Sequence, residues 1–376
     1  MRFLIVDTDY QSFLDSLYAQ HPGLENEPYA RQLQVRAESG FACGLSYSDN
    51  LCELGHEAHQ IFFNNEPLQM AWAREHGVKI ERRWRFRMRR GVVPWLWRTN
   101  DPSSLYDVLS AQIRHYRPDV LLNNAMRLNA AYFRAIKPQL KLLVGCHGSP
   151  LPEDRDFAAY DLVLSVVENF VDRFRAEGLK SELLRLAFEP QLLQRFNSTK
   201  EQSIPVSFIG QLTQAHSSRQ DWLEYVCEHL PVQVWSPSTD GLRRDSPVIP
   251  CHRGPAWGIG MYEILHRSLT TLNHHIDVAG ECAGNARLFE ATGMGTLLIT
   301  DWKTNLNKMF AAGKEVVAYR SHEECAELTR YYVEHPEEGE AIARAGQQRT
   351  LRDHTYFQRM QEFAAIVGKH LHANVN

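Results

Sequence analysis

Short apolar runs and stretches of helical periodicity alternate along the chain. In the first half, apolar runs predict buried strands at 3–6, 58–63, 118–123, 141–145 and 160–165. Helices are predicted around them at about 10–37, 66–76, 103–116, 128–137 and 168–177. Such alternation predicts a parallel, doubly wound sheet, which binds its ligands at the carboxyl ends of the strands.

A polar segment near 197–203 interrupts this pattern, which then starts again. The second half has predicted strands at 205–210, 232–235, 269–275 and 296–301. A chain of 376 residues also exceeds what one hydrophobic core usually supports. We therefore expect two α/β domains, at 1–200 and 201–355.

The last segment, 356–376, has the pattern of an amphipathic helix. Its apolar residues recur at helical spacing: Phe357, Met360, Phe363, Ile366 and Val367. A helix of this kind covers a core with its apolar face. The pattern fits two arrangements equally well, packing on the second domain or a return across the cleft to the first.

The clearest candidate chemistry lies in the loop and helix at 280–295. Gly284, Asn285 and Ala286 lead into the helix, whose first amides have no partner within it and lie at the positive end of its dipole. Such a helix start is a natural site for a phosphate group. Arg287 and Glu290 are three residues apart and so share a face. An acid in that position can accept hydrogen bonds from a ribose.

This region resembles the second domain of CgeB-like glycosyltransferases. The matching residues, in order, are Asn285, Arg287, Phe289, Glu290, Gly295 and Asp301. The likeness continues at 310–319, 335–338, 343–346 and 354–356, and in all it covers about 205–358. It implies the GT-B fold, in which two Rossmann-like, doubly wound α/β domains face each other across a cleft. It also implies that the second domain binds a UDP-, GDP- or dTDP-linked sugar.

The resemblance assigns further residues to the donor. Gly210 ends a strand where a residue without Cβ lets the backbone approach the nucleotide. Arg219 matches an arginine of the family, and Trp235 ends the next predicted strand. Tyr262 belongs to a helix whose start borders the base in the family.

Two positions depart from better-known GT-B enzymes. Those enzymes have an arginine and a lysine where this chain has Gln211 and His216. The diphosphate is then left to Arg219, Arg287 and backbone amides, without a metal ion.

The stereochemical signature is also incomplete. Retaining GT-B enzymes carry two glutamates separated by seven residues, whereas Glu281 and Glu290 are separated by eight. Only Glu290 matches, and it matches the glutamate that meets the ribose. The resemblance implies a retaining enzyme, but the motif leaves retention and inversion open.

The first domain offers three candidates on the acceptor side. Gly40 and Gly44 flank a short loop before a helix, and such a loop often shapes the acceptor site in GT-B enzymes, although both glycines also fit ordinary turns. His147 ends a predicted strand, where the family often places a histidine near the reacting sugar, and it is our catalytic candidate. Asp7 and Asp9 imitate a DxD metal motif, but we interpret them as strand-end and helix-cap residues.

The segment 82–90 alternates arginines with apolar side chains. Its arginines at alternate positions are Arg83, Arg85, Arg87 and Arg89. A strand would place them on one face and the apolar residues on the other. One interpretation is a site for an anionic or lipid-linked acceptor or for a phospholipid surface. The other is a solvated strand with its apolar face on the core.

Composition restricts the partners and the compartment. The net charge of −4 excludes a general affinity for nucleic acid. No apolar run approaches the ~20 residues that cross a membrane, and acidic residues come too early for a secretory signal. Seven cysteines without a CxxC pair fit a reducing compartment. We expect a cytoplasmic protein with at most peripheral membrane contact, no metal and no resident cofactor.

The sequence therefore predicts a metal-independent glycosyltransferase that acts in cell-surface glycan, glycolipid, protein or secondary-metabolite glycosylation. It names neither the base, the sugar nor the acceptor. One alternative is a non-hydrolysing nucleotide-sugar epimerase, which shares the fold but needs cleft carboxylates that the sequence does not reveal. The other is a non-catalytic sugar-nucleotide-binding protein, which Gln211, His216 and the missing glutamate favour.

Overall fold

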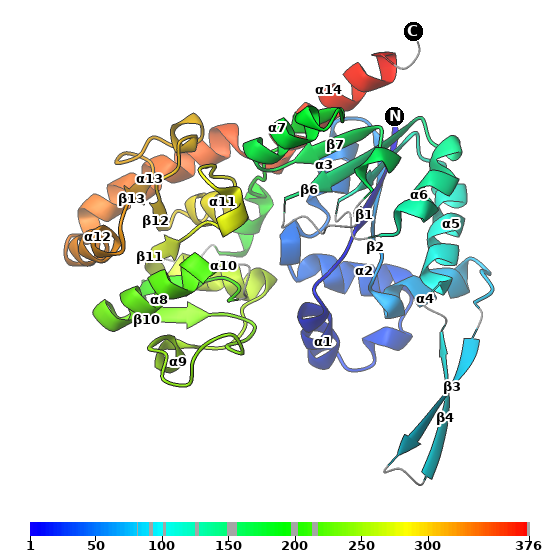
Figure 1. The fold of residues 1–376 in the computed structure, drawn as a ribbon, viewed down its shortest axis with the longest axis horizontal. Coiled ribbons are helices and arrows are strands. Elements are labelled where there is room, and N and C mark those ends of the chain that lie inside the picture. The colour runs from blue at the N-terminus through cyan, green and yellow to red at the C-terminus, as the bar shows by residue number, and fades with distance from the viewer. Residues whose placement is uncertain are drawn as a thin grey trace.

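The computed structural model describes residues 1–80, 82–89, 93–100, 103–124, 128–148, 156–196, 202–212 and 217–373, with the backbone alone for 82–89 and 93–100. Two α/β domains, each built on a parallel sheet, lie side by side, and the C-terminal helix runs along the first domain (Figure 1). This arrangement confirms the predicted pair of doubly wound domains.

The first sheet contains six parallel strands in the order β2-β1-β5-β6-β7-β8. They are β1 (Arg2–Asp7), β2 (Glu57–Phe62), β5 (Val120–Asn123), β6 (Leu142–His147), β7 (Leu162–Ser165) and β8 (Ser181–Leu183). Their interiors are apolar at consecutive positions because helices cover both faces of the sheet. Each of the five apolar runs predicted in the first half therefore contains a strand, whereas β8 was not predicted.

Helices cover this sheet on both faces. They are α1 (Gln11–Gln20), α2 (Tyr29–Glu38), α3 (Ser46–Glu53), α4 (Glu66–Glu75), α5 (Ser104–Tyr116), α6 (Ala130–Ile136) and α7 (Glu168–Ala176). The helix predicted over 10–37 is thus two helices. The break between them contains Gly23, with a φ of +90°, and Pro28, which precedes α2. A left-handed residue and a proline end one helix and start the next.

Strand alternation divides the core of the first domain into two clusters. On β1, Phe3 and Ile5 belong to the cluster under α3, whereas Leu4 and Val6 belong to the cluster that contains Phe170 of α7. Successive side chains of a strand point to opposite faces of the sheet. The same alternation decides which strand-end side chains meet above each core.

The Arg-rich segment forms an antiparallel hairpin of β3 (Arg82–Arg89) and β4 (Val93–Asn100). Its backbone projects from the body of the first domain (Figure 1). The strand predicted for the arginines is confirmed. The side chains of Arg83, Arg85, Arg87 and Arg89 lie outside the described residues, so their role stays a prediction.

The second sheet contains five parallel strands in the order β10-β9-β11-β12-β13. They are β9 (Ile204–Ile209), β10 (Val232–Trp235), β11 (Ser268–Asn273), β12 (Leu297–Asp301) and β13 (Val317–Tyr319). The accompanying helices are α8 (Ser217–His229), α9 (Val248–Cys251), α10 (Gly258–Arg267), α11 (Ala286–Gly293), α12 (His322–Glu334) and α13 (Pro336–Asp353). Because β11 ends at Asn273, His274 and His275 lie in the loop that follows it.

The final helix, α14 (Tyr356–Ala373), packs on the first domain although it follows the second in sequence. Tyr356, Met360, Phe363 and Val367 are buried in the cluster that also contains Phe3 and Ile5. The helix runs along the first sheet in Figure 1. Of the two arrangements that the sequence allowed, the structure has the return to the first domain.

Candidate functional site

A cleft of about 600 Å³ lies between the carboxyl ends of the two sheets. Asp7, Asn124 and Cys146 contribute to its wall from the first domain. Gly210 and Trp235 contribute from the second domain. Ligands of doubly wound sheets bind at this edge because the loops there diverge and helix N-termini point toward it.

The start of α11 opens into this cleft without a capping side chain. Asn285 is the N-cap residue, yet its side chain makes no capping bond. Its Nδ2 instead donates to Oδ1 of Asn273 at 2.6 Å, and Asn273 in turn donates to Thr300. No capping side chain therefore competes with an anion in the cleft for the first-turn amides of α11, of which that of Leu288 donates to the Asn285 carbonyl at 3.3 Å.

Arg287 and Glu290 lie one turn further along α11 and both line the cleft. Nη1 of Arg287 is 3.0 Å from the Glu290 carboxylate, and Nη2 donates to the carbonyl of Ile209 at 3.2 Å. Both side chains are about nine-tenths buried, at 11% and 13% exposed. The ion pair holds one cation and one hydrogen-bond acceptor side by side near the N-terminus of α11, the positive end of its dipole.

Arg219 also lines the cleft, but its guanidinium is held by backbone carbonyls. It donates to His274 at 2.6 Å and to Gln211 at 3.2 Å. Burial lowers the pKa of Arg219 to about 10. Gly210 lies close to this guanidinium. A Cβ on Gly210 would lie 2.9 Å from the ring of Phe208 and 3.7 Å from Nη1 of Arg219.

Three predicted site residues lie outside the cleft wall. Tyr262 is buried in the second core, with its hydroxyl 3.7 Å from Sγ of Cys43, because its position on α10 faces inward. Gly284 is an interdomain contact, where a Cβ would lie 2.7 Å from the carbonyl of Val166. Gly44 has its carbonyl bonded to Arg36 at 3.0 Å. Gly40, Trp235, Asn285 and Ala286 do line the cleft.

The loop at 40–44 has an unusual backbone. Ala42 and Cys43 have φ values of +45° and +61°, which non-glycine residues rarely adopt. The loop is held by the buried guanidinium of Arg36, which donates to Phe41 and Gly44 carbonyls and pairs with Asp9 at 2.5 Å. Strain of this kind persists where surrounding contacts over-determine it, and it concentrates at functional sites.

His147 lines the cleft but is only 2% exposed. Its ring centroid lies 6.0 Å from those of Phe157 and Phe170. These phenylalanines pack on the α7 side of the sheet, so His147 and its neighbour Cys146 point to opposite faces. His147 is therefore set deep in the wall at the α7 side of the cleft.

A polar group of residues that our sequence reasoning did not assign to a site lies on the other face. Oδ1 of Asp7 accepts from Nδ2 of Asn124 at 2.7 Å, and Oδ2 accepts from Nε2 of Gln60 at 2.6 Å. Burial, the largest influence, raises the pKa of Asp7 to about 6. The available signal was a polar residue close to the carboxyl end of each of three predicted strands, Gln60 within one and Asp7 and Asn124 just after the others, but each strand shows it alone.

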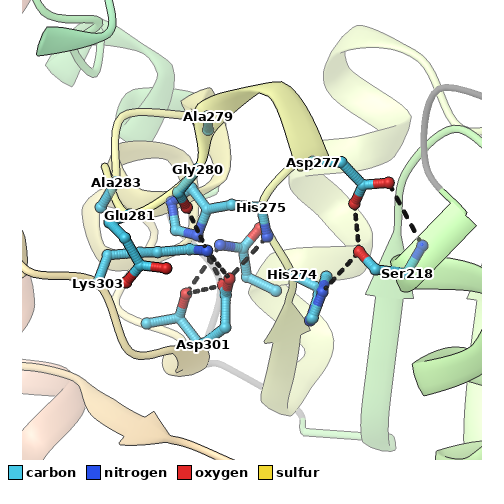
Figure 2. Close-up of polar contacts among 12 residues, drawn as sticks. Ser218, His274, His275, Asp277, Ala279, Gly280, Glu281, Ala283, Asp301 and Lys303 are labelled. Atoms are coloured by element: carbon cyan, nitrogen blue, oxygen red, sulfur yellow. Dashed lines mark hydrogen bonds and ion pairs between the residues drawn. The ribbon is translucent and has the colours of Figure 1, made fainter. Parts of the chain in front are cut away.

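A second polar network lies beside the cleft, where β11 and β12 end. Figure 2 shows His275 and Lys303 converging on Asp301, and Ser218 between His274 and Asp277. His275 Nδ1 is 2.6 Å from Asp301, and the nearby positive charge holds the pKa of Asp301 far below its usual range although burial opposes this. Burial lowers the pKa of His274 to about 4. These bonds fix the loop that leads into α11.

Within the described residues, no group of three or more His, Cys, Asp or Glu side chains is arranged to hold a metal ion. Asp9 pairs with Arg36, and the carboxylate of Asp7 accepts hydrogen bonds from Gln60 and Asn124. The helices in the part of the chain that the structure describes include none that is long and apolar enough to cross a membrane.

Comparison with solved structures places this arrangement in the GT-B class. Anabaena Alr3699/HepE, solved in complex with UDP and glucose, has a TM-score of 0.59 at 12% identity, and the alignment covers 98% of this chain and 100% of that one. The sucrose-phosphate synthase of Thermosynechococcus elongatus has a TM-score of 0.56 at 10% identity, covering 99% and 100%. The predicted GT-B fold is therefore confirmed.

A weaker likeness is to a UDP-N-acetylglucosamine 2-epimerase, named as putative in its own description, from Listeria monocytogenes, with a TM-score of 0.52 at 11% identity over 99% of this chain and 97% of that one. By sequence, residues 218–365 match the family described as "Glycosyl transferase-like". That match covers the second domain from α8 onward and the first part of α14. No curated protein matches the chain by sequence.

Proposed function

We propose that the protein is a glycosyltransferase that moves a sugar from a nucleotide-activated donor to an acceptor bound by the first domain. The observation that carries this proposal is the start of α11, where uncapped amides, Arg287 and Glu290 meet in the interdomain cleft. The match of residues 218–365 to a glycosyl transferase-like family supports it. So does the Anabaena neighbour of the same fold, which was solved with UDP and glucose and with UDP-glucose.

In this proposal the donor diphosphate lies at the N-terminus of α11. The helix amides and the Arg287 guanidinium neutralise its charge, and the leaving diphosphate is stabilised by donors that are already in place. Glu290 accepts a hydrogen bond from the ribose. Arg219 contributes mainly by fixing the loop after β11, because its guanidinium is already bonded to two carbonyls. No step in this scheme needs a divalent cation.

Several finer points belong to the proposal. The resemblance in the second domain implies a place among CgeB-like enzymes and retention of the sugar's anomeric configuration. The anomeric configuration of the product tests whether the enzyme is retaining. His147 stays our candidate for a group near the reacting sugar. The arginines of the β3–β4 hairpin are proposed to contact an anionic or lipid-linked acceptor. The cytoplasm, where nucleotide sugars are made, is the proposed compartment.

A thermal-shift assay with UDP, GDP and dTDP, each alone, tests the donor site. A nucleotide at a hundred times its dissociation constant stabilises the folded state by about 2.7 kcal/mol. We expect one of the three to raise the melting temperature of the wild type and Glu290→Ala to abolish the rise. Glu281→Ala is the matched control, because Glu281 is exposed in the preceding loop and does not line the cleft.

Incubation with the corresponding nucleotide sugar then separates the candidate activities. Release of free nucleotide supports transfer. An altered sugar on intact nucleotide supports the epimerase, for which the Listeria neighbour is the specific argument. Tight binding without turnover supports a binding protein. A shift that Glu290→Ala leaves at full size removes this residue from the donor site.

A further inference from the structure

A group of polar side chains lies at the carboxyl ends of the first sheet, on the face covered by α3 and α14. Asp7, Gln60 and Cys146 each follow core residues of that face at alternate positions along β1, β2 and β6. Asn124, just after β5, joins them through its bond to Asp7. The neighbouring parallel strands β2, β1, β5 and β6 thus bring side chains separated by up to 139 positions in sequence to one point of the cleft wall.

The carboxylate of Asp7 is only partly satisfied by its protein partners. Gln60 and Asn124 each give it one hydrogen bond, one to each oxygen. An ionised carboxylate accepts about four hydrogen bonds in all. Asp7 lines the cleft and is partly exposed to it, so the remaining lone pairs are accessible to a ligand there.

The nearest cation does not pair with Asp7. Arg36, from α2, is bonded to both oxygens of Asp9 and to the carbonyls of the 40–44 loop. Besides burial, the charge of Asp9 raises the pKa of Asp7. Tyr47 of α3 and Cys146 of β6 also interact with Asp7, and burial raises the pKa of the Tyr47 phenol and of the Cys146 thiol well above neutrality. Tyr47 and Cys146 are therefore neutral in the pH range where Asp7 changes its charge.

A carboxyl in this setting stabilises the fold poorly and marks a candidate functional residue. The strained loop beside it supports the same conclusion from backbone geometry. Ala42 and Cys43, both with positive φ, line the same cleft and are held there by Arg36. Two independent features, an incompletely bonded carboxylate and a strained loop, thus lie together on the wall opposite α11.

We propose that Asp7 binds the acceptor: its carboxylate accepts a hydrogen bond from a hydroxyl group of the acceptor, between the 40–44 loop and the donor. This inference rests on the proposed function and deepens it. It implies that the group entering this subsite is a neutral polyol or sugar, because a phosphate or carboxylate would be repelled by Asp7. Anionic parts of an acceptor would have to lie elsewhere, outside this end of the cleft.

The test uses the full chain and compares Asp7→Asn with Asp15→Asn, an exposed aspartate on α1. UDP-glucose is the donor probe, with glycerol and methyl glucoside as neutral acceptor probes and glycerol 3-phosphate as the anionic one. Acceptor-dependent UDP release is measured against the background with water. We expect the neutral probes to accelerate release by the wild type, and glycerol 3-phosphate not to.

For Asp7→Asn we expect the acceptor KM to rise tenfold or more while the thermal shift with UDP stays at its wild-type size. In the wild type, acceptor affinity should fall as the pH drops through about 6, where Asp7 becomes protonated. This fall should be absent in Asp7→Asn and should persist in Asp15→Asn. Unchanged acceptor KM in Asp7→Asn, or preference for the anionic probe, overturns the inference. Loss of the UDP shift in Asp7→Asn overturns it as well, because Asp7 would then serve the donor or the fold.

Failure of the proposed function gives a different result. In that case the wild type shows no thermal shift with UDP, GDP or dTDP and no release of nucleotide. Asp7 would then have no acceptor to bind, and the inference would be overturned together with the function. A wild type that shows the shift and hydrolyses UDP-glucose, but is accelerated by none of the neutral probes, overturns the inference alone.

Discussion

The amide of Ile259 donates a hydrogen bond of 2.8 Å to the carbonyl of Ser39, and this bond joins the start of α10 to the 40–44 loop across the two domains. The residue before it, Gly258, has a φ of +50°. A Cβ on Gly258 would lie 1.9 Å from the Ser39 carbonyl oxygen and 2.8 Å from the Phe41 nitrogen. Only glycine permits this approach of the two backbones.

We expect Gly258→Ala to separate the two domains at this contact. A methyl group cannot fit at 1.9 Å from backbone, so either the helix or the loop must move. Small-angle scattering should show a larger radius of gyration, and nucleotide-sugar turnover should fall at least tenfold, because an open cleft admits water and misplaces the acceptor. Gly260→Ala is the control on the same helix, since a Cβ there meets nothing within 4 Å. Equal behaviour of the two variants would contradict this role of Gly258.

Arg36→Met should strongly destabilise the first domain. Arg36 and Asp9 are each about 1% exposed, and removing the cation leaves a buried carboxylate without its partner. Breaking a buried ion pair in this way costs about 3–5 kcal/mol. Urea unfolding measures the change. The double variant Asp9→Asn, Arg36→Met should recover part of the loss, because it removes the buried charge as well. A double variant no more stable than Arg36→Met would show that the ion pair is not the cause.

Asp7→Asn should stabilise the protein at neutral pH. The folded-state pKa of Asp7, about 6, is above the unfolded value of 3.8, so the folded state favours the protonated carboxyl. Its contribution to stability is complete below pH 3.8 and is lost as pH rises through 6. At pH 7.5 we expect a gain of about 1–2 kcal/mol for the variant, after allowance for partial exposure, and almost none below pH 4. Chemical denaturation at both pH values measures it. The exposed Asp15→Asn should show no such pH dependence.

The elements that local pattern defines were predictable from the sequence. Most strands of the two sheets were predicted from apolar runs, although β8 and β13 were not, and the shared face of Arg287 and Glu290 was predicted from helical spacing. The Asn285 side chain was predicted to lie at a helix start, and it does. These features depend on residues within one turn or one strand, so no knowledge of distant contacts is needed.

The acceptor side could not be predicted in the same way. The bonds of Asp7 to Gln60 and Asn124 depend on the register of three strands, and a shift of one residue in any strand would turn its side chain to the other face. Tyr262 shows the same limit for a helix. Its role was taken from a motif, but in the structure its side of α10 faces the core, where its hydroxyl lies beside Cys43 of the other domain.

Phe363 should be needed for the first domain although it lies near the end of the chain. Its ring is fully buried and lies 5.7 Å from that of Phe3 on β1, so α14 completes the core on that face. Phe363→Ala should cost about 3–5 kcal/mol, as the loss of a buried aromatic ring usually does. Gln361→Ala, at an exposed position of the same helix, should change stability by less than about 0.5 kcal/mol. Urea unfolding should be followed at Trp72 in the first domain and Trp222 in the second, with the other tryptophans replaced. If α14 belongs to the first core, the midpoint at Trp72 falls more than that at Trp222. A larger fall at Trp222 would show instead that the helix mainly supports the second domain.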